Sequence, residues 1–169
     1  LEEATMGVLR TRVHRQLRQV DGTGHEARYR LVCPALPNDG NGCLNVHSKL
    51  AFIDDDAFTI GSANLSNRSL ACDTECNLCI AADGSPEQRA RIRAGLAAMR
   101  ARLLAEHLGV TPQRVLQACQ PPARLFAAID ALTTPPRFLK AFEPVAQPEI
   151  DALIPQQAPF DPERTIAPE

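Results

Sequence analysis

Aromatic side chains are scarce in this sequence of 169 residues, which contains no tryptophan, one tyrosine and six phenylalanines. Proteins that bind single-stranded nucleic acid stack its bases on aromatic side chains, so this scarcity argues against nucleic acid as a partner. Long apolar runs are also missing, because no stretch approaches the ~20 residues of a membrane span and no signal peptide is recognisable. We therefore do not expect a membrane-spanning segment.

The chain also has little net charge, with a formal value of −2. The charge is uneven: residues 1–140 carry 17 Lys/Arg and 14 Asp/Glu, whereas residues 141–169 carry one arginine and six acidic residues. This mild basic excess can favour an anionic substrate or a membrane surface. It is too small for the basic footprint of a DNA-binding domain.

Hydrophobic residues make up 44% of the chain, so a core can form without a disulfide scaffold. We therefore expect the cysteines to be mostly reduced, in a cytoplasmic domain or one that faces the cytosol. A disulfide across the loop between Cys33 and Cys43 is the alternative, which that compartment disfavours. Cys72, Cys76 and Cys79 have spacing reminiscent of a zinc site, but no nearby Cys or His completes four ligands.

Apolar periodicity predicts a helix over residues 4–20. Its apolar face contains Met6, Leu9, Val13, Leu17 and Val20, and its solvated basic face contains Arg10, His14 and Arg18. Strands are predicted at residues 27–33, 44–53, 57–62 and 74–82, with a loop or short helix at 63–70. Together they predict an α/β domain with a mixed sheet, in which the strand carrying His47 lies at or near the centre.

The character of the sequence changes at Ser85, which is a typical helix cap and is followed by Pro86 at the first helical position. This helix is predicted to reach about His107 and to end at Gly109. Shorter helices are predicted at 112–118 and 123–132, with helical turns at 136–142 and 148–153. The sequence thus predicts a core over 1–84, packing helices over 85–132, and a proline-rich acidic tail over 133–169. The helix at 4–20 and the one from residue 86 are expected to cover the sheet.

The stretch from His47 to Asn64 is where spacing suggests a reaction. His47 and Lys49 are two residues apart on a predicted strand, so both point to the same face. An imidazole can attack phosphorus or move a proton, and a neighbouring ammonium offsets charge on phosphate oxygens. Ser62 and Asn64 can donate hydrogen bonds to the same oxygens. Glu75, predicted on the following strand, is the candidate carboxylate that orients the histidine.

The pattern His47-x-Lys49-x4-Asp54-x6-Gly61-Ser62-x-Asn64 resembles the full HKD signature of the phospholipase D superfamily. The segments Asn67-Arg68-Ser69 and Asp73-Thr74-Glu75 are similar to the residues found after that signature in bacterial members. The resemblance extends with less specificity over residues 1–82. It implies a phospholipase D-like α/β fold, with a helical, proline-rich C-terminal extension in this chain.

The resemblance also implies a function, which is phosphodiester hydrolysis or phosphatidyl transfer through a covalent phosphohistidine, without a metal or another cofactor. His47 would be one of two catalytic histidines, while Lys49 and Asn64 would bind phosphate oxygens. Ser62 would support that pocket, and Glu75 would orient the histidine. Asp54 matches the aspartate of the motif, and its place at a strand end suggests a structural role.

The chain contains one HKD motif, whereas the implied site needs two. His14, His25 and His107 lack a lysine two residues later. Because the sequence begins with Leu1-Glu2-Glu3 rather than Met, we expect the C-terminal half of a bacterial phospholipase D-like protein, with the second motif in a missing N-terminal half. The alternatives are a nuclease-like phosphodiesterase that acts as a homodimer, and a catalytically silent half with an interaction role. The expected substrate is a phospholipid or another phosphodiester.

Overall fold

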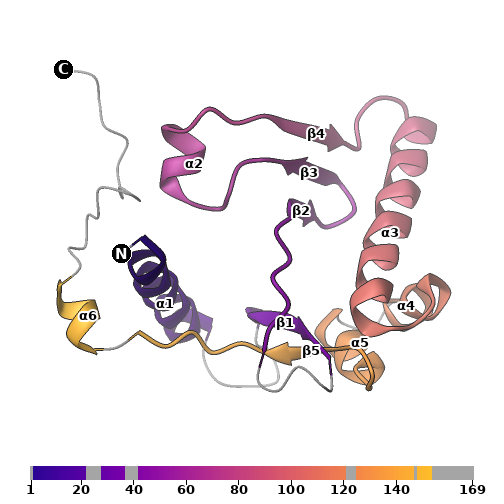
Figure 1. Cartoon of the computed structure of the whole chain (residues 1–169). Helices are drawn as coiled ribbons and strands as arrows, with labels where there is room; N and C mark the ends of the chain where they lie inside the picture. Colours follow the sequence, from indigo (N-terminus) through magenta and orange to yellow (C-terminus); the bar gives the residue numbers. More distant parts are fainter. Residues whose placement is uncertain (1, 22–27, 37–41, 121–124, 147, 154–169) are drawn as a thin grey trace. The chain divides into compact units, whose positions relative to one another are not determined.

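The computed structural model describes residues 2–21, 28–36, 42–120, 125–146 and 148–153. Figure 1 shows its helices and strands in chain order, which are α1 (Glu2–Asp21), β1 (Val32–Ala35), β2 (Lys49–Ile53), β3 (Ala57–Gly61), α2 (Asn67–Ala71), β4 (Asn77–Ala81), α3 (Pro86–Leu108), α4 (Pro112–Ala118), α5 (Leu125–Leu132), β5 (Phe138–Ala141) and α6 (Pro148–Leu153). The predicted α/β fold class is confirmed. None of the described helices is both long enough and apolar enough to cross a membrane.

The chain divides into two compact units that are each built from separate stretches of sequence. The first unit contains Leu1–Val32, Ala63–Glu75 and Ala141–Glu169, and the second contains Cys33–Ser62 and Cys76–Lys140. The second unit therefore holds β2, β3 and β4 together with α3, α4 and α5. The predicted division at residues 84 and 132 stays a prediction.

Strands β2, β3 and β4 form an antiparallel sheet in that order. The register pairs Lys49 with Gly61, and Gly61 in turn with Asn77. The strand next to His47 therefore lies at an edge of this described sheet, and the prediction of a central position is wrong. A second sheet pairs β1 with β5, so the single mixed sheet that we predicted is replaced by two small sheets.

The apolar face of the three-stranded sheet carries Phe58, which is 2% exposed and is the largest of the fully buried side chains described. The Phe58 ring packs against Phe52 on β2, with the ring centroids 4.7 Å apart. Two arginines of α3 form ion pairs with the turn between β2 and β3. Arg93 lies 2.6 Å from the Asp56 carboxylate, and Arg100 lies 2.6 Å from that of Asp55.

The bounds of α3 follow from its terminal residues, as the sequence predicts. The Ser85 hydroxyl accepts a hydrogen bond from the Gln88 N–H, and the Gln88 side chain accepts one from the Ser85 N–H at 2.8 Å. This capping box satisfies amides that the first turn leaves without partners. Gly109 ends the helix with a left-handed φ of 64°, which glycine adopts at little cost.

The described core of the second unit lies between α3, α4 and α5. Its buried members are Ala101, Ala105, Leu108, Val115 and Leu132. The helices predicted at 112–118 and 123–132 are confirmed as α4 and α5, although residues 123 and 124 lie outside the described part. The helical turn predicted at 148–153 is confirmed as α6. The turn predicted at 136–142 is wrong, because this segment forms β5 by pairing with β1.

Three of the predicted strands begin several residues before the strands that form. Residues 44–48 have no regular structure, because the β2 ladder ends where Lys49 meets Gly61, the last residue of β3. The strand predicted at 74–82 begins only at Asn77 for the same reason. Residues 28–31 are also irregular, and residue 27 lies outside the described part of the chain.

Helix α1 buries a different face from the one that apolar periodicity predicts. Val8, Thr11 and His14 are buried, whereas Val13, Leu17 and Val20 of the predicted apolar face are exposed. His14 is 5% exposed because distant polar groups satisfy its ring. Nδ1 lies 3.1 Å from the Tyr29 hydroxyl and Nε2 lies 2.9 Å from the Glu143 carboxylate. Burial, and secondarily the charge of Glu143, raises the pKa of Tyr29.

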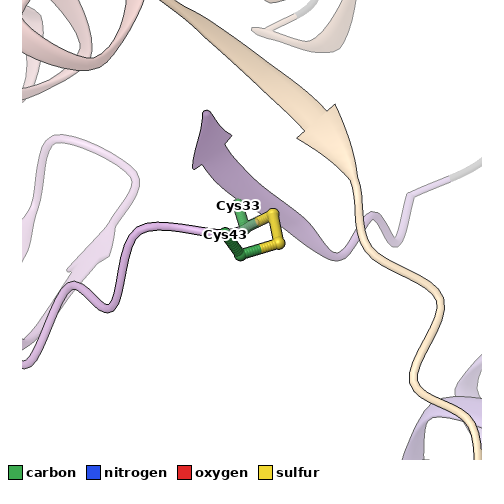
Figure 2. The surroundings of a disulfide bond; sticks show 2 residues. All are labelled: Cys33 and Cys43. Atoms are coloured by element: carbon green, nitrogen blue, oxygen red, sulfur yellow. A yellow bond between two sulfur atoms is a disulfide. The ribbon is translucent and has the colours of Figure 1, made fainter. Parts of the chain in front are cut away.

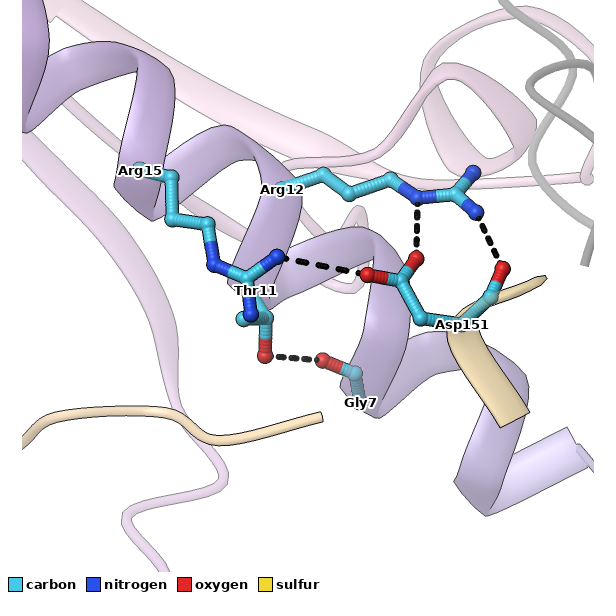
Figure 3. A network of polar contacts seen from close by, with 5 residues as sticks. All are labelled: Gly7, Thr11, Arg12, Arg15 and Asp151. Carbon is cyan, nitrogen blue, oxygen red and sulfur yellow. Dashed lines mark hydrogen bonds and ion pairs between the residues drawn. The ribbon is translucent and has the colours of Figure 1, made fainter. Parts of the chain in front are cut away.

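A polar network joins α6 to α1 within the first unit (Figure 3). The Arg12 guanidinium donates to the Asp151 carboxylate at 2.8 Å and to the Asp151 carbonyl oxygen at 2.8 Å. Arg15 donates to the other carboxylate oxygen at 3.2 Å. The hydrogen bond from Arg12, supported by Arg15, lowers the pKa of Asp151. The Asp151 carboxylate of α6 thus binds both arginines of α1.

We expect the contact between α6 and α1 to become less stable as the pH falls. The variant Asp151→Asn should remove this pH dependence. A carboxyl group whose pKa is lowered by folding stabilises the fold above its unfolded pKa, and this contribution disappears as pH falls through the folded pKa. Thermal melts from about pH 2 to 6 check this. The melting temperature of the wild type should exceed that of the variant by a constant margin near the top of this pH range. The two melting temperatures should converge at the lowest pH values. Parallel curves at all pH values would contradict the assignment.

Figure 2 shows a disulfide between Cys33 and Cys43. The expectation of reduced cysteines is wrong for this pair. The Leu44 N–H donates to the Pro34 carbonyl oxygen at 2.9 Å, which brings the chain back to β1. The two Cα atoms then lie 5.6 Å apart, within the range that a disulfide spans. The predicted cytoplasmic location rests on reduced cysteines, so it loses that support.

Candidate active site

The structure brings His47 and Lys49 into direct contact. Lys49 Nζ lies 3.0 Å from both ring nitrogens of His47 and donates to the His47 carbonyl oxygen at 2.8 Å. His47 is exposed, and Lys49 is half-buried at the start of β2. Because an ammonium has three N–H donors, one donor can reach a phosphate oxygen while the others hold the histidine. The predicted pairing of an imidazole with an ammonium is therefore present.

Gly61 lies beside Lys49 in the sheet, and its lack of a side chain allows β4 to approach closely. A Cβ added at Gly61 would lie 2.7 Å from Asn77 Cα, and it would collide with the Cys76 carbonyl oxygen and the Asn77 side chain. Lys49 and Asn77 flank Gly61 in the register, so all three share one face. Asn77 is thus a polar residue of this face that sequence reasoning missed. The feature that identifies Asn77 is its position opposite Gly61. This position can be known only from the register between β3 and β4.

We expect Gly61→Ala to destabilise the second unit, because backbone atoms cannot move away from the new methyl group cheaply. Overpacking of this kind typically costs about 1–3 kcal/mol. Gly95→Ala is a matched control, since a Cβ at Gly95 on α3 meets nothing within 4 Å and alanine favours a helix by about 0.5–1 kcal/mol. In urea denaturation, the free energy of unfolding should fall for Gly61→Ala and rise for Gly95→Ala. A stabilised Gly61→Ala would contradict the close packing.

Ser62 continues the contact between β3 and β4 beyond the regular strands. Its N–H donates to the Cys76 carbonyl oxygen at 3.1 Å, and its hydroxyl oxygen accepts from the Cys76 N–H at 3.0 Å. The hydroxyl oxygen is therefore engaged by backbone, which fixes the turn that follows the glycine. This contact is compatible with the supporting role predicted for Ser62, which stays a prediction.

Asp54 begins the turn after β2 and has a left-handed φ of 50°, which aspartate tolerates better than most residues. Its carbonyl oxygen accepts from Arg100 of α3 at 2.9 Å. The described contact of Asp54 is thus with the scaffold and not with His47. This arrangement fits the structural role suggested for the motif aspartate.

Asn64 and Glu75 belong to the first unit, whereas His47, Lys49, Asp54 and Ser62 belong to the second. Asn64 is exposed, and its carbonyl oxygen accepts from the Ser66 N–H at 2.8 Å. Glu75 is half-buried and precedes β4 instead of lying on a strand as predicted. Their predicted roles, phosphate binding for Asn64 and orientation of the histidine for Glu75, remain proposals.

A cavity of about 540 Å³ lies on the other side of the motif strand. Val46, Ser48, Leu50 and Phe52 line it together with Leu103, Leu104 and His107 of α3. These four residues alternate with His47 and Lys49 along the chain, so they lie on the opposite side of the strand from Lys49. Among the described residues, no group of three or more His, Cys, Asp or Glu side chains could hold a metal ion, so the zinc alternative has no cluster to support it.

A protein-family model matches the N-terminal part of the chain. The family described as cardiolipin synthase, PLD-like domain, matches residues 3–94, which is more than half of the chain and includes the whole motif. No curated protein and no solved structure matches the chain significantly. The chain therefore belongs to the phospholipase D superfamily, whose enzymes cleave or exchange phosphodiesters.

Proposed function

We propose that this chain supplies one half of an active site that hydrolyses a phosphodiester, or transfers a phosphatidyl group, through a phosphohistidine. The observation that carries the proposal is the contact between His47 and Lys49 within a complete HKD motif. The Lys49 ammonium lies 3.0 Å from the His47 ring, so a phosphate that contacts one side chain can also contact the other. The family match over residues 3–94 supports the same class of reaction.

The proposed reaction has two steps that share the same pair of histidines. A ring nitrogen of one histidine attacks phosphorus, so an N–P bond forms while the bond from phosphorus to the leaving oxygen breaks. The second histidine donates its proton to that leaving alcohol. Water or another alcohol then attacks phosphorus, gives its proton to the second histidine, and breaks the N–P bond. His47 fills one of these two roles.

Lys49 stabilises the charge that develops on the phosphate oxygens during both steps. The contact of 3.0 Å between its ammonium and the His47 ring supports this role. Asn64 would add a side-chain amide donor to the same oxygens, and Ser62 would hold the loop that presents it. Glu75 would orient the imidazole by accepting a hydrogen bond from its other nitrogen.

The second histidine comes from another motif, either in a longer protein or in a second copy of this chain. Sedimentation of the purified chain, combined with hydrolysis of bis(p-nitrophenyl) phosphate, separates these cases. An inactive monomer that gains activity when the rest of the protein is present supports a half-site. An active dimer supports a site completed by a second copy. If neither form hydrolyses this diester or a phospholipid in vesicles, the proposal is wrong.

A further inference from the structure

The segment that carries His47 is exposed and lacks regular structure. Residues 42–48 are all exposed, and strand pairing starts only at Lys49. A catalytic side chain has to be held within about 0.5 Å of its productive position. Lys49 pairs with Gly61 and fixes the C-terminal end of the segment. The N-terminal end needs an anchor of its own.

That anchor is the disulfide between Cys43 and Cys33 (Figure 2). Cys33 is buried within β1, which pairs with β5, so its side chain is attached to an ordered sheet. Cys43 is exposed and stands four residues before His47. One backbone hydrogen bond, from the Leu44 N–H to the Pro34 carbonyl oxygen at 2.9 Å, accompanies the disulfide. Without the covalent link, this bond and weak packing of Val46 would hold the chain before His47, and His47 itself would keep only its contacts with Lys49.

We propose that the Cys33–Cys43 disulfide positions His47, and that reducing it disorders the catalytic histidine while the three-stranded sheet stays folded. This proposal rests on the proposed function, since it assigns the disulfide a role through His47. Both cysteines act as positioning residues and neither touches the substrate. The redox state of this disulfide then controls the site.

A dithiol reductant reaches this disulfide from the side of Cys43. One thiolate of the reductant attacks the sulfur of Cys43, which is the exposed residue of the pair; the bond between the two protein sulfurs breaks, and Cys33 leaves as a thiolate. The second thiol of the reductant then attacks the mixed disulfide and releases Cys43. The reductant loses two electrons and becomes a disulfide, while the protein gains two thiols.

The first test uses the full chain and needs no substrate. Titration of the denatured, unreduced chain should find four thiols, which are Cys72, Cys76, Cys79 and Cys119. NMR of the folded chain should show contacts between the Lys49 side chain and the His47 ring. Adding dithiothreitol should abolish these contacts and speed exchange of the Leu44 amide. The contact between His14 and Tyr29 is the internal control and should persist.

The double variant Cys33→Ser/Cys43→Ser should reproduce the reduced state and lose its response to dithiothreitol, while Cys72→Ser should keep the wild-type response. Six titratable thiols, or an unchanged contact between Lys49 and His47 after reduction, would overturn the proposal. If the double variant fails to fold, the reduced wild type decides the question alone.

The second test measures turnover in the assembly that carries both motifs. Displacing a catalytic group by about 1 Å costs roughly 10²-fold in rate, so reduction should lower kcat by that order with a smaller change in KM. Equal kcat in both redox states overturns the proposal. If the protein lacks turnover in both states while the NMR contacts still depend on the disulfide, the proposed function fails and the positioning of His47 stands.

Discussion

Replacing His47 by asparagine is expected to lower kcat by roughly 10³- to 10⁶-fold, depending on whether it acts as acid or nucleophile. Asparagine keeps a polar side chain of similar size but can neither form the N–P bond nor transfer a proton at neutral pH. The measurement is phosphodiester hydrolysis by the active assembly that carries both motifs. Because His47 is exposed, the free energy of unfolding should change by less than about 0.5 kcal/mol.

The matched control for this experiment is His107→Asn. His107 lies on α3, is half-buried, and lacks a lysine two residues later. Its replacement removes a histidine from the same unit without changing a motif residue, so kcat should stay within about twofold of wild type. If His47→Asn retains wild-type turnover, the motif in this chain is catalytically silent, and an interaction role becomes the better account.

Replacing Phe58 by alanine is expected to lower the free energy of unfolding by about 3–5 kcal/mol. The ring is 2% exposed and packs against Phe52, so its removal leaves a cavity beneath β2. That loss is a large share of the roughly 5–15 kcal/mol that stabilises a typical domain. The chain has no tryptophan, so urea denaturation is best followed by far-ultraviolet circular dichroism.

Ile53→Ala provides the control for Phe58. Ile53 is on the neighbouring strand β2 but is 61% exposed, so its truncation should cost less than about 0.5 kcal/mol. Similar losses in the two variants would mean that the apolar face of this sheet is not the packed one. The expected contrast therefore tests the register that also places Lys49 on the opposite face.

Local signals in the sequence are sufficient to predict those features of the structure that depend on residues close together in the chain. Ser85, Pro86 and Gly109 define α3 because caps and helix ends are made by residues a few positions apart. The acidic turn from Asp54 to Asp56 likewise joins the two predicted strands in an antiparallel pair. The HKD motif is readable for the same reason, since Lys49, Asp54 and Gly61 lie on that hairpin and the other motif residues lie within three positions of its ends.

Features that depend on distant residues could not be read in this way. His14 belongs to the predicted basic face of α1, yet it is buried because Tyr29 and Glu143 satisfy its ring. The late start of β2 at Lys49 follows from the place where β3 ends, and the pairing of Cys33 with Cys43 follows from the return of the chain to β1. The scaffold contact of Asp54 needs Arg100, which lies 46 residues away.

The chemistry of the motif can be tested directly on the covalent intermediate. The active assembly is incubated with a phosphodiester labelled on phosphorus, quenched in alkali and digested, and the labelled peptide is identified by mass spectrometry. A phosphohistidine is expected on His47 or on the histidine of the second motif, stable in alkali and lost in acid, and it should disappear in His47→Asn if His47 is the nucleophile. Turnover without an adduct on either histidine would contradict the proposed phosphohistidine mechanism.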